Sequence, residues 1–139
     1  MTSRAALLPY PGDPFLLNYW LKFFDEVWGD EVDKLYIYLN SPIEKPVVDY
    51  IRDLCLKRPK INLQYNPQQI EHGAVIDRLL GVVEEDYVML IEDDGFIFKK
   101  GLVNACFEAI ESGEKQIVGS KRGSMQFRDF RSLKTAVRA

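Results

Sequence analysis

Residues 87–95 read YVMLIEDDG, an unbroken apolar run that passes directly into three consecutive carboxylates. A short apolar run without alternation is typical of a strand buried on both faces, as in a parallel sheet. Gly95 follows the acids and allows the backbone to turn sharply. The segment therefore predicts a buried parallel strand that ends with acidic side chains at the carboxyl edge of a sheet, where open α/β sheets bind ligands.

Strand-like and helix-like patterns alternate on both sides of this segment. The predicted strands cover residues 5–10, 35–39, 61–65, 87–91 and 116–119. In the predicted helices, apolar residues recur every three or four positions, over residues 15–28, 47–55, 69–83 and 103–110. Such alternation is typical of βαβ units. We expect an α/β fold, a three-layer α/β/α arrangement with a mostly parallel, Rossmann-like sheet.

Composition sets limits on the class of protein. The chain has 139 residues, of which 47% are hydrophobic, so a single folded domain is expected and disorder is not. A net charge of -3 argues against a nucleic-acid partner. From Lys121 onward, however, six basic residues accompany one acid, Asp129. This basic end can contact phosphates, a membrane surface or another domain, or can simply be solvated.

Cysteine usage and hydropathy bear on the compartment. Cys55 and Cys106 have a spacing that fits neither a zinc site nor a disulfide framework, so small buried thiols are expected. The chain contains no apolar stretch long enough for a transmembrane segment and no signal-peptide pattern. The sequence therefore favours a cytoplasmic protein.

The three carboxylates Glu92, Asp93 and Asp94 indicate a cation-binding site. Adjacent negative charges repel one another, which is costly unless a cation or hydrogen-bond donors compensate. Mg²⁺ and Mn²⁺ prefer carboxylate oxygens together with the phosphate oxygens of a substrate. A plain acidic turn is the alternative, because Asp-Asp-Gly is also common turn chemistry. The apolar residues 96–98 after the acids make a simple exposed turn the weaker interpretation.

Two segments together resemble a known family. HGAVIDRLLG (72–81), followed by DYVMLIEDDG (86–95), is similar to the glycine-to-arginine helix and DXD-like motif of GT-A glycosyltransferases, close to family 2. The resemblance covers about residues 5–124. It implies a metal-dependent transfer of sugar from a nucleotide-diphosphate sugar to an acceptor that stays unknown. Residues 1–124 would form the nucleotide-sugar-binding domain, and the basic tail 125–139 would begin an acceptor-binding half.

The resemblance also implies roles for individual residues. Asp94 matches the metal ligand, for Mn²⁺ or Mg²⁺, while Glu92 and Asp93 match positions that contact ribose or base. The other nucleotide-sugar contacts that the resemblance implies are Pro9, Tyr10, Asn40 and Arg78. His72 is added on its own account, because this single histidine stands beside Gly73 at the start of the predicted helix. Two positions depart from the family pattern. Asn40 stands where an aspartate often contacts the base, and Leu79 stands where an asparagine is expected, so the identity of the base stays open.

Each of these roles has a structural alternative. Arg78 can bind phosphate oxygens, or it can be a surface arginine paired with Asp77 or Glu84. Tyr10 can stack on a base, or it can be half-buried at a strand end. His72 can line the site, or it can simply be a polar residue at a helix start.

The functional prediction has open alternatives as well. Catalytic residues stay unknown, because nothing singles out the acids Glu114 and Asp129 as a general base. A noncatalytic nucleotide-sugar-binding or assembly module that requires a partner chain is the main alternative. A nucleotidyltransferase is a weaker one, because the loop after the first strand is proline-rich with one glycine. The helix over 15–28 carries Trp20, Phe23, Phe24 and Trp28; an aromatic residue facing outward there would mark an interface, and homo-oligomer formation stays open.

Overall fold

The computed structural model describes residues 2–40 and 44–115 of the chain. The predicted strand 116–119, the basic residues from Lys121 onward and the tail 125–139 lie outside the described residues. Within the described part, four strands form one parallel sheet in the order β3-β2-β1-β4. The strands are β1 (Arg4–Tyr10), β2 (Lys34–Leu39), β3 (Ile61–Tyr65) and β4 (Tyr87–Leu90).

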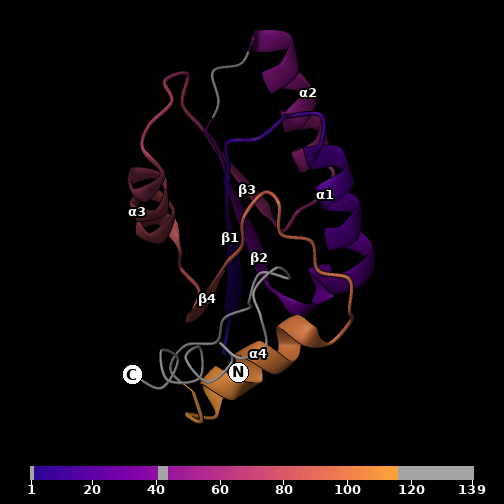
Figure 1. The fold of residues 1–139 in the computed structure, drawn as a ribbon, viewed down its shortest axis with the longest axis vertical. Helices are drawn as coiled ribbons and strands as arrows, with labels where there is room; N and C mark the ends of the chain where they lie inside the picture. Colours follow the sequence, from indigo (N-terminus) through magenta and orange to yellow (C-terminus); the bar gives the residue numbers. More distant parts are fainter. Residues whose placement is uncertain (1, 41–43, 116–139) are drawn as a thin grey trace, which may run out of the picture.

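Helices lie on both faces of this sheet, which confirms the predicted α/β class (Figure 1). They are α1 (Leu17–Phe23), α2 (Lys45–Leu56), α3 (His72–Val82) and α4 (Leu102–Glu111). Side chains of α1, α2 and α4 pack in one core, and those of α3 pack in another. The chain winds outward from β1 to β3 and then returns past β1 to form β4. The winding direction therefore reverses between β1 and β4, at the topological switch point of the sheet.

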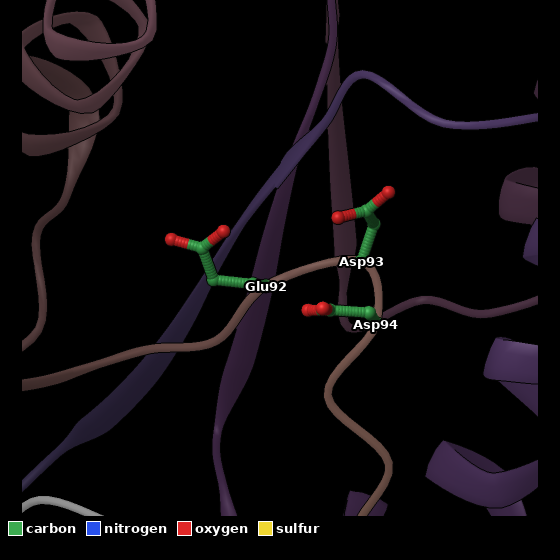
Figure 2. Close-up of side chains that lie close together, drawn as sticks. All are labelled: Glu92, Asp93 and Asp94. Carbon is green, nitrogen blue, oxygen red and sulfur yellow. The ribbon is translucent and has the colours of Figure 1, made fainter. Parts of the chain in front are cut away.

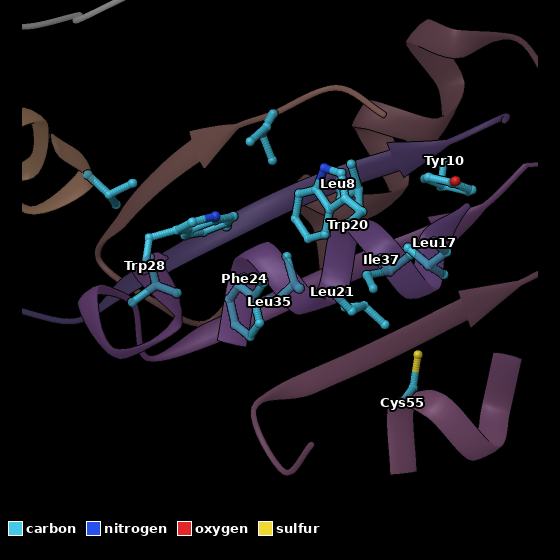
Figure 3. Packing of buried hydrophobic residues seen from close by; sticks show 14 of the residues in the cluster. Leu8, Tyr10, Leu17, Trp20, Leu21, Phe24, Trp28, Leu35, Ile37 and Cys55 are labelled. Atoms are coloured by element: carbon cyan, nitrogen blue, oxygen red, sulfur yellow. The ribbon is translucent and has the colours of Figure 1, made fainter. Parts of the chain in front are cut away.

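Alternating side chains of the central strands supply the two cores. Leu8, Leu35 and Ile37 face α1 and α2, where the large aromatic side chains of the first helical segment cover them (Figure 3). Leu7 and Tyr38 face the other way, toward α3. Burial on both faces explains why β1 and β2 are apolar almost throughout.

The helix expected over 15–28 is divided. α1 ends at Phe23, and Phe24–Trp28 form a single π-helical turn followed by a 3₁₀ turn at Gly29–Glu31. Gly29 donates its N–H to the carbonyl of Phe24, and a Cβ atom at Gly29 would lie 2.7 Å from that oxygen. Glycine therefore permits the close approach that closes the wider turn.

The aromatic residues of this segment behave mostly as core. Trp20, Phe24 and Trp28 are buried and pack against one another. Phe23 is only half-buried, with its ring 5.4 Å from that of Phe96 and 5.2 Å from that of Phe98.

The expectation that the strand over 87–91 is buried on both faces is wrong. β4 ends at Leu90, and its residues alternate between half-buried and exposed, with Val88 40% and Leu90 49% exposed. The physical reason is position, because β4 lies at the edge of the four-stranded sheet that the described residues form, while α3 packs over β1 and β2. In the described ranges, no helix has the length and apolar character needed to cross a bilayer.

Candidate functional site

The pairing between β1 and β4 stops at a proline. Leu7 is aligned with Leu90, and the N–H of Ile91 donates to the carbonyl of Leu7 at 3.0 Å. The next bond in a parallel ladder would run from the N–H of residue 9 to the carbonyl of Ile91, but Pro9 has no N–H. The chain therefore leaves the sheet after Ile91, immediately before the acids. Pro9 itself is buried inside β1, aligned with Tyr38 of β2.

Glu92, Asp93 and Asp94 occupy a tight turn at the end of β4, here called the acid turn (Figure 2). One oxygen each of Glu92, Asp93 and Asp94 lies within 4.8 Å of the others. The N–H of Gly95 closes the turn onto the carbonyl of Glu92 at 2.9 Å. Trp20 of α1 donates its indole N–H to the carbonyl of Gly95 at 3.0 Å. The turn is therefore anchored to the core through its backbone, and the carboxylates stay available.

The side chains of this turn reach both sides of the sheet. Glu92 points toward α3, where its Oε1 lies 3.4 Å from Nε2 of His72, an ion pair when the imidazole is protonated. Asp93 points toward the loop after β1, where a Cβ atom at Gly12 would lie only 2.6 Å from its Oδ2. Two predicted site residues, His72 and Glu92, are thus brought together, and an unpredicted residue, Gly12, lies against a third.

Tyr10 ends β1 beside this turn. Its side chain is 2% exposed, and its hydroxyl donates to the carbonyl of Asp13 at 2.7 Å. Burial, with the nearby charges of Asp93 and Asp13, raises the pKa of Tyr10 to about 12. The tyrosine is therefore neutral and held in place at the side of the loop after β1. For its ring to stack on a base, as the sequence predicts, one face of the ring would have to be uncovered.

Asn40, the predicted base contact after β2, is 4% exposed. Its Nδ2 donates to the carbonyl of Ile70, and its Oδ1 accepts the N–H of the same residue, both at 2.9 Å. The amide thus ties the end of β2 to the segment before α3. This structural role accounts for a buried asparagine at the position, and a contact with a base stays a prediction.

Arg78 lies about 1.7 turns along α3 from His72. Its Nη1 donates to the hydroxyl of Tyr38 at 3.0 Å, and its guanidinium lies 6.0 Å from the centre of that ring. Neither predicted partner, Asp77 or Glu84, is bonded to it among the described contacts. The side chain is exposed, so its remaining N–H groups are accessible to a ligand.

Comparisons with known proteins do not suggest a function for this chain. No family model and no curated protein matches this chain. The chemistry of the acid turn is therefore the main guide to the function.

The acid turn fits a hard divalent cation. Oxygen ligands on one Mg²⁺ or Mn²⁺ ion lie about 3 to 4 Å apart, because each sits near 2.1 Å from the metal. The observed limit of 4.8 Å is slightly wider, so small side-chain rotations would bring the oxygens into range. Such rotations are accessible because Glu92 and Asp94 are exposed and Asp93 is only half-buried.

The acid turn is open to solvent, and two hollows found among the described residues lie elsewhere. One, of about 420 Å³, is lined by residues of α2 and β3, including Arg52 and Leu63. The other, of about 430 Å³, lies at the amino ends of the strands, beside Arg4 and Glu111. Glu114 follows Glu111 closely, so it belongs to the end of the sheet opposite the acids. Asp129, the other acid considered as a base, lies outside the described residues.

Sequence reasoning missed Gly12 and Tyr38. Gly12 is the single glycine in the proline-rich loop 9–14, which was a usable signal for a close backbone approach. Tyr38 gives no such signal, because a tyrosine in an apolar strand is ordinary core chemistry. Only the packing of α3 over β2 shows that its hydroxyl meets Arg78.

Proposed function

We propose that this chain binds a nucleotide-diphosphate sugar together with Mn²⁺ or Mg²⁺, and acts as the donor-binding part of a GT-A-type, family 2-like glycosyltransferase. The observation that carries the proposal is the meeting of three carboxylates at the switch point between β1 and β4. Open parallel sheets bind their ligands at this place, because the loops there separate and leave backbone and side-chain groups unpaired.

The three acids point in different directions, so each would have its own role in the proposed complex. Asp94, exposed at the tip of the turn, would be a metal ligand, with Asp93 and Glu92 close enough to contribute or to contact the ribose. When bound, the divalent ion would offset the negative charge that develops on the departing nucleoside diphosphate. Arg78 would offer its free N–H groups to phosphate oxygens. Tyr10 and Gly12 would form the wall against which Asp93 is held.

The first prediction concerns Asp94. Asp94→Ala should abolish metal-dependent binding of the donor while the fold survives, because the side chain is exposed and no described hydrogen bond depends on it. A thermal-shift screen of nucleotide-diphosphate sugars with and without Mn²⁺ measures this directly. A ligand at 100 times its dissociation constant stabilises the native state by about 2.7 kcal/mol, so even weak donors register.

The matched control is Asp53→Ala, which removes an exposed aspartate from α2. It should retain the full metal-dependent shift. Equal donor affinity of the parent chain in Mn²⁺ and in chelator would contradict the proposal. So would an equal loss of affinity in the two variants.

The alternative function is a noncatalytic nucleotide-sugar-binding or assembly module that requires a partner chain. One observation favours keeping it. Glu114, a candidate general base within the described residues, follows α4 at the end of the sheet opposite the acid turn. Metal-dependent binding of a donor without its turnover would support this module over the enzyme.

A further inference from the structure

Trp20 of α1 is buried among aromatic rings, and its indole carries a single polar group, the Nε1–H. Phe24 stacks on the indole with ring centres 6.3 Å apart, and Trp28 packs against it edge-on at 5.6 Å (Figure 3). A buried indole N–H needs an acceptor, because an unpaired donor in the core is costly. The acceptor is the carbonyl of Gly95, at 3.0 Å. Since the neighbouring rings hold the indole, this bond restricts where the carbonyl of Gly95 can lie.

Gly95 transmits this restriction to the acid turn. Its N–H donates to the carbonyl of Glu92 at 2.9 Å, and a Cβ atom at Gly95 would lie 3.1 Å from that oxygen and 3.2 Å from Cγ1 of Ile91. The backbone on the inner side of the turn is therefore closely packed. Before the acids, the N–H of Ile91 donates to the carbonyl of Leu7. The three carboxylates are thus held between two backbone anchors, one in the sheet and one on α1.

α1 also contacts the segment that follows the turn. The ring of Phe23 meets those of Phe96 and Phe98 edge-on, with interplanar angles of 73° and 88°. Trp20 and Phe23 are three positions apart in α1 and are therefore neighbours on its surface. Residues 95–98 thus run along one helix. The bond from Trp20 is the directional contact among these, because the energy of a hydrogen bond depends steeply on its angle.

Compactness of the acid turn matters for cation binding. Without a cation, the carboxylates of Glu92, Asp93 and Asp94 repel one another and favour a wider turn. A divalent ion requires their oxygens, now within 4.8 Å of one another, to come to about 3 to 4 Å. A turn that is already held compact loses less conformational freedom when it binds, so its affinity is higher.

We propose that Trp20 is a positioning residue for the cation, because its hydrogen bond to Gly95 holds the acid turn in the compact form that binds a divalent ion. The inference rests on the proposed function, since it concerns the same metal site. Trp20 would not touch the ion. It would act through the backbone of Gly95 and Glu92, so the aromatic core under α1 would set the affinity of the acid turn.

Trp20→Phe tests this bond, because it keeps an aromatic ring in the core and removes the N–H. Trp28→Phe is the matched control. It makes the same substitution in the same aromatic cluster, at a side chain equally buried, and none of the described hydrogen bonds links the indole of Trp28 to the acid turn. Both variants leave a similar cavity, so urea unfolding should show similar losses of stability.

Isothermal titration measures the binding of Mn²⁺ together with uridine, guanosine and adenosine diphosphate in turn. With the nucleotide that binds best, Trp20→Phe should bind about fivefold more weakly than the parent chain, as expected for the loss of one neutral hydrogen bond. Trp28→Phe should bind like the parent. Affinity therefore separates the positioning role from a general loss of core packing.

The two tryptophans of the chain also provide a spectroscopic readout that a purely structural role would not move. In NMR spectra of the parent chain, Mg²⁺ with the same nucleotide should shift the indole N–H signal of Trp20 and leave that of Trp28 nearly unchanged. Trp28→Phe assigns the two signals. Without metal, the backbone amide of Gly95 should exchange with solvent faster in Trp20→Phe than in Trp28→Phe, because the turn opens more often.

The outcomes separate this inference from the proposed function. If the parent binds metal and nucleotide, equal affinities of Trp20→Phe and Trp28→Phe would overturn the role of Trp20 alone. An indole signal of Trp20 that does not respond to Mg²⁺ would do the same, and this titration decides the matter even where Trp20→Phe does not fold. Absence of metal-dependent nucleotide binding to the parent chain would overturn both proposals together.

Discussion

Gly12 determines how closely Asp93 can approach the loop after β1. A Cβ atom there would lie 2.6 Å from Oδ2 of Asp93 and 3.6 Å from the ring of Tyr10. The carboxylate is the mobile partner in this contact, since it is the end of a short, half-buried side chain and the tyrosine is fully buried. A methyl group at position 12 would therefore displace Asp93 from its place in the acid turn.

Gly12→Ala should weaken metal-dependent donor binding several-fold and leave thermal stability nearly unchanged, because only the half-buried carboxylate of Asp93 has to move. Isothermal titration with Mn²⁺ and a nucleoside diphosphate measures the effect. Gly81→Ala is the control, since a Cβ atom there meets nothing within 4 Å. If Gly12→Ala binds as tightly as that control, then Asp93 has no part in the site.

At the scale of the element, α3 links the acid turn to the centre of the sheet. Its first residue, His72, lies beside Glu92, and about 9 Å further along the helix Arg78 lies over Tyr38. The bond between Asn40 and Ile70 fixes the segment that leads into the helix. A ligand across the carboxyl edge would therefore meet a positioned helix rather than a free loop.

Arg78→Ala tests whether this helix contributes to phosphate binding. The variant should bind a nucleoside diphosphate about tenfold more weakly and the matching nucleoside almost unchanged, because a charge-assisted bond to phosphate is lost. Competition titrations with the two ligands measure the difference. Equal losses for both would show that Arg78 acts only through its hydrogen bond to the hydroxyl of Tyr38, and Tyr38→Phe would then reproduce them.

At the scale of the whole molecule, three buried groups couple folding to alkaline pH. Burial raises the pKa of Tyr10 and of Tyr36 from 10.0 to about 12, and Glu85 adds to the effect at Tyr36. Burial likewise raises the pKa of the Cys55 thiol from 9.0 to about 11. Between the two values of each group, the unfolded chain has released a proton that the folded chain retains.

Stability should therefore fall as the pH rises from about 9 to about 12, because the folded state binds more protons there. Urea unfolding at a series of pH values measures the slope. Tyr10→Phe should make the slope shallower between pH 10 and 12, since the variant lacks one of the three groups. An unchanged slope would mean that Tyr10 ionises alike in both states.

The periodicity of apolar residues, together with proline and glycine at the segment ends, was sufficient to predict the alternation of strands and helices, the parallel sheet and the acidic end of the fourth strand. These are local patterns, and each segment's neighbours in the chain determine them. Tyr10 and Asn40 were placed correctly at strand ends, yet their hydrogen bonds to Asp13 and Ile70 needed the folded loops.

Only the tertiary structure decided that β4 is the last strand of the sheet formed by the described residues, that the winding direction reverses beside β1 and that Gly12 lies against Asp93. These features depend on which distant segments pair, and an apolar run reads the same whether one or both of its faces are covered. The sequence shows that acids follow Ile91. Packing decided that they lie between the start of α3 and the point where Pro9 ends the pairing of β1 with β4.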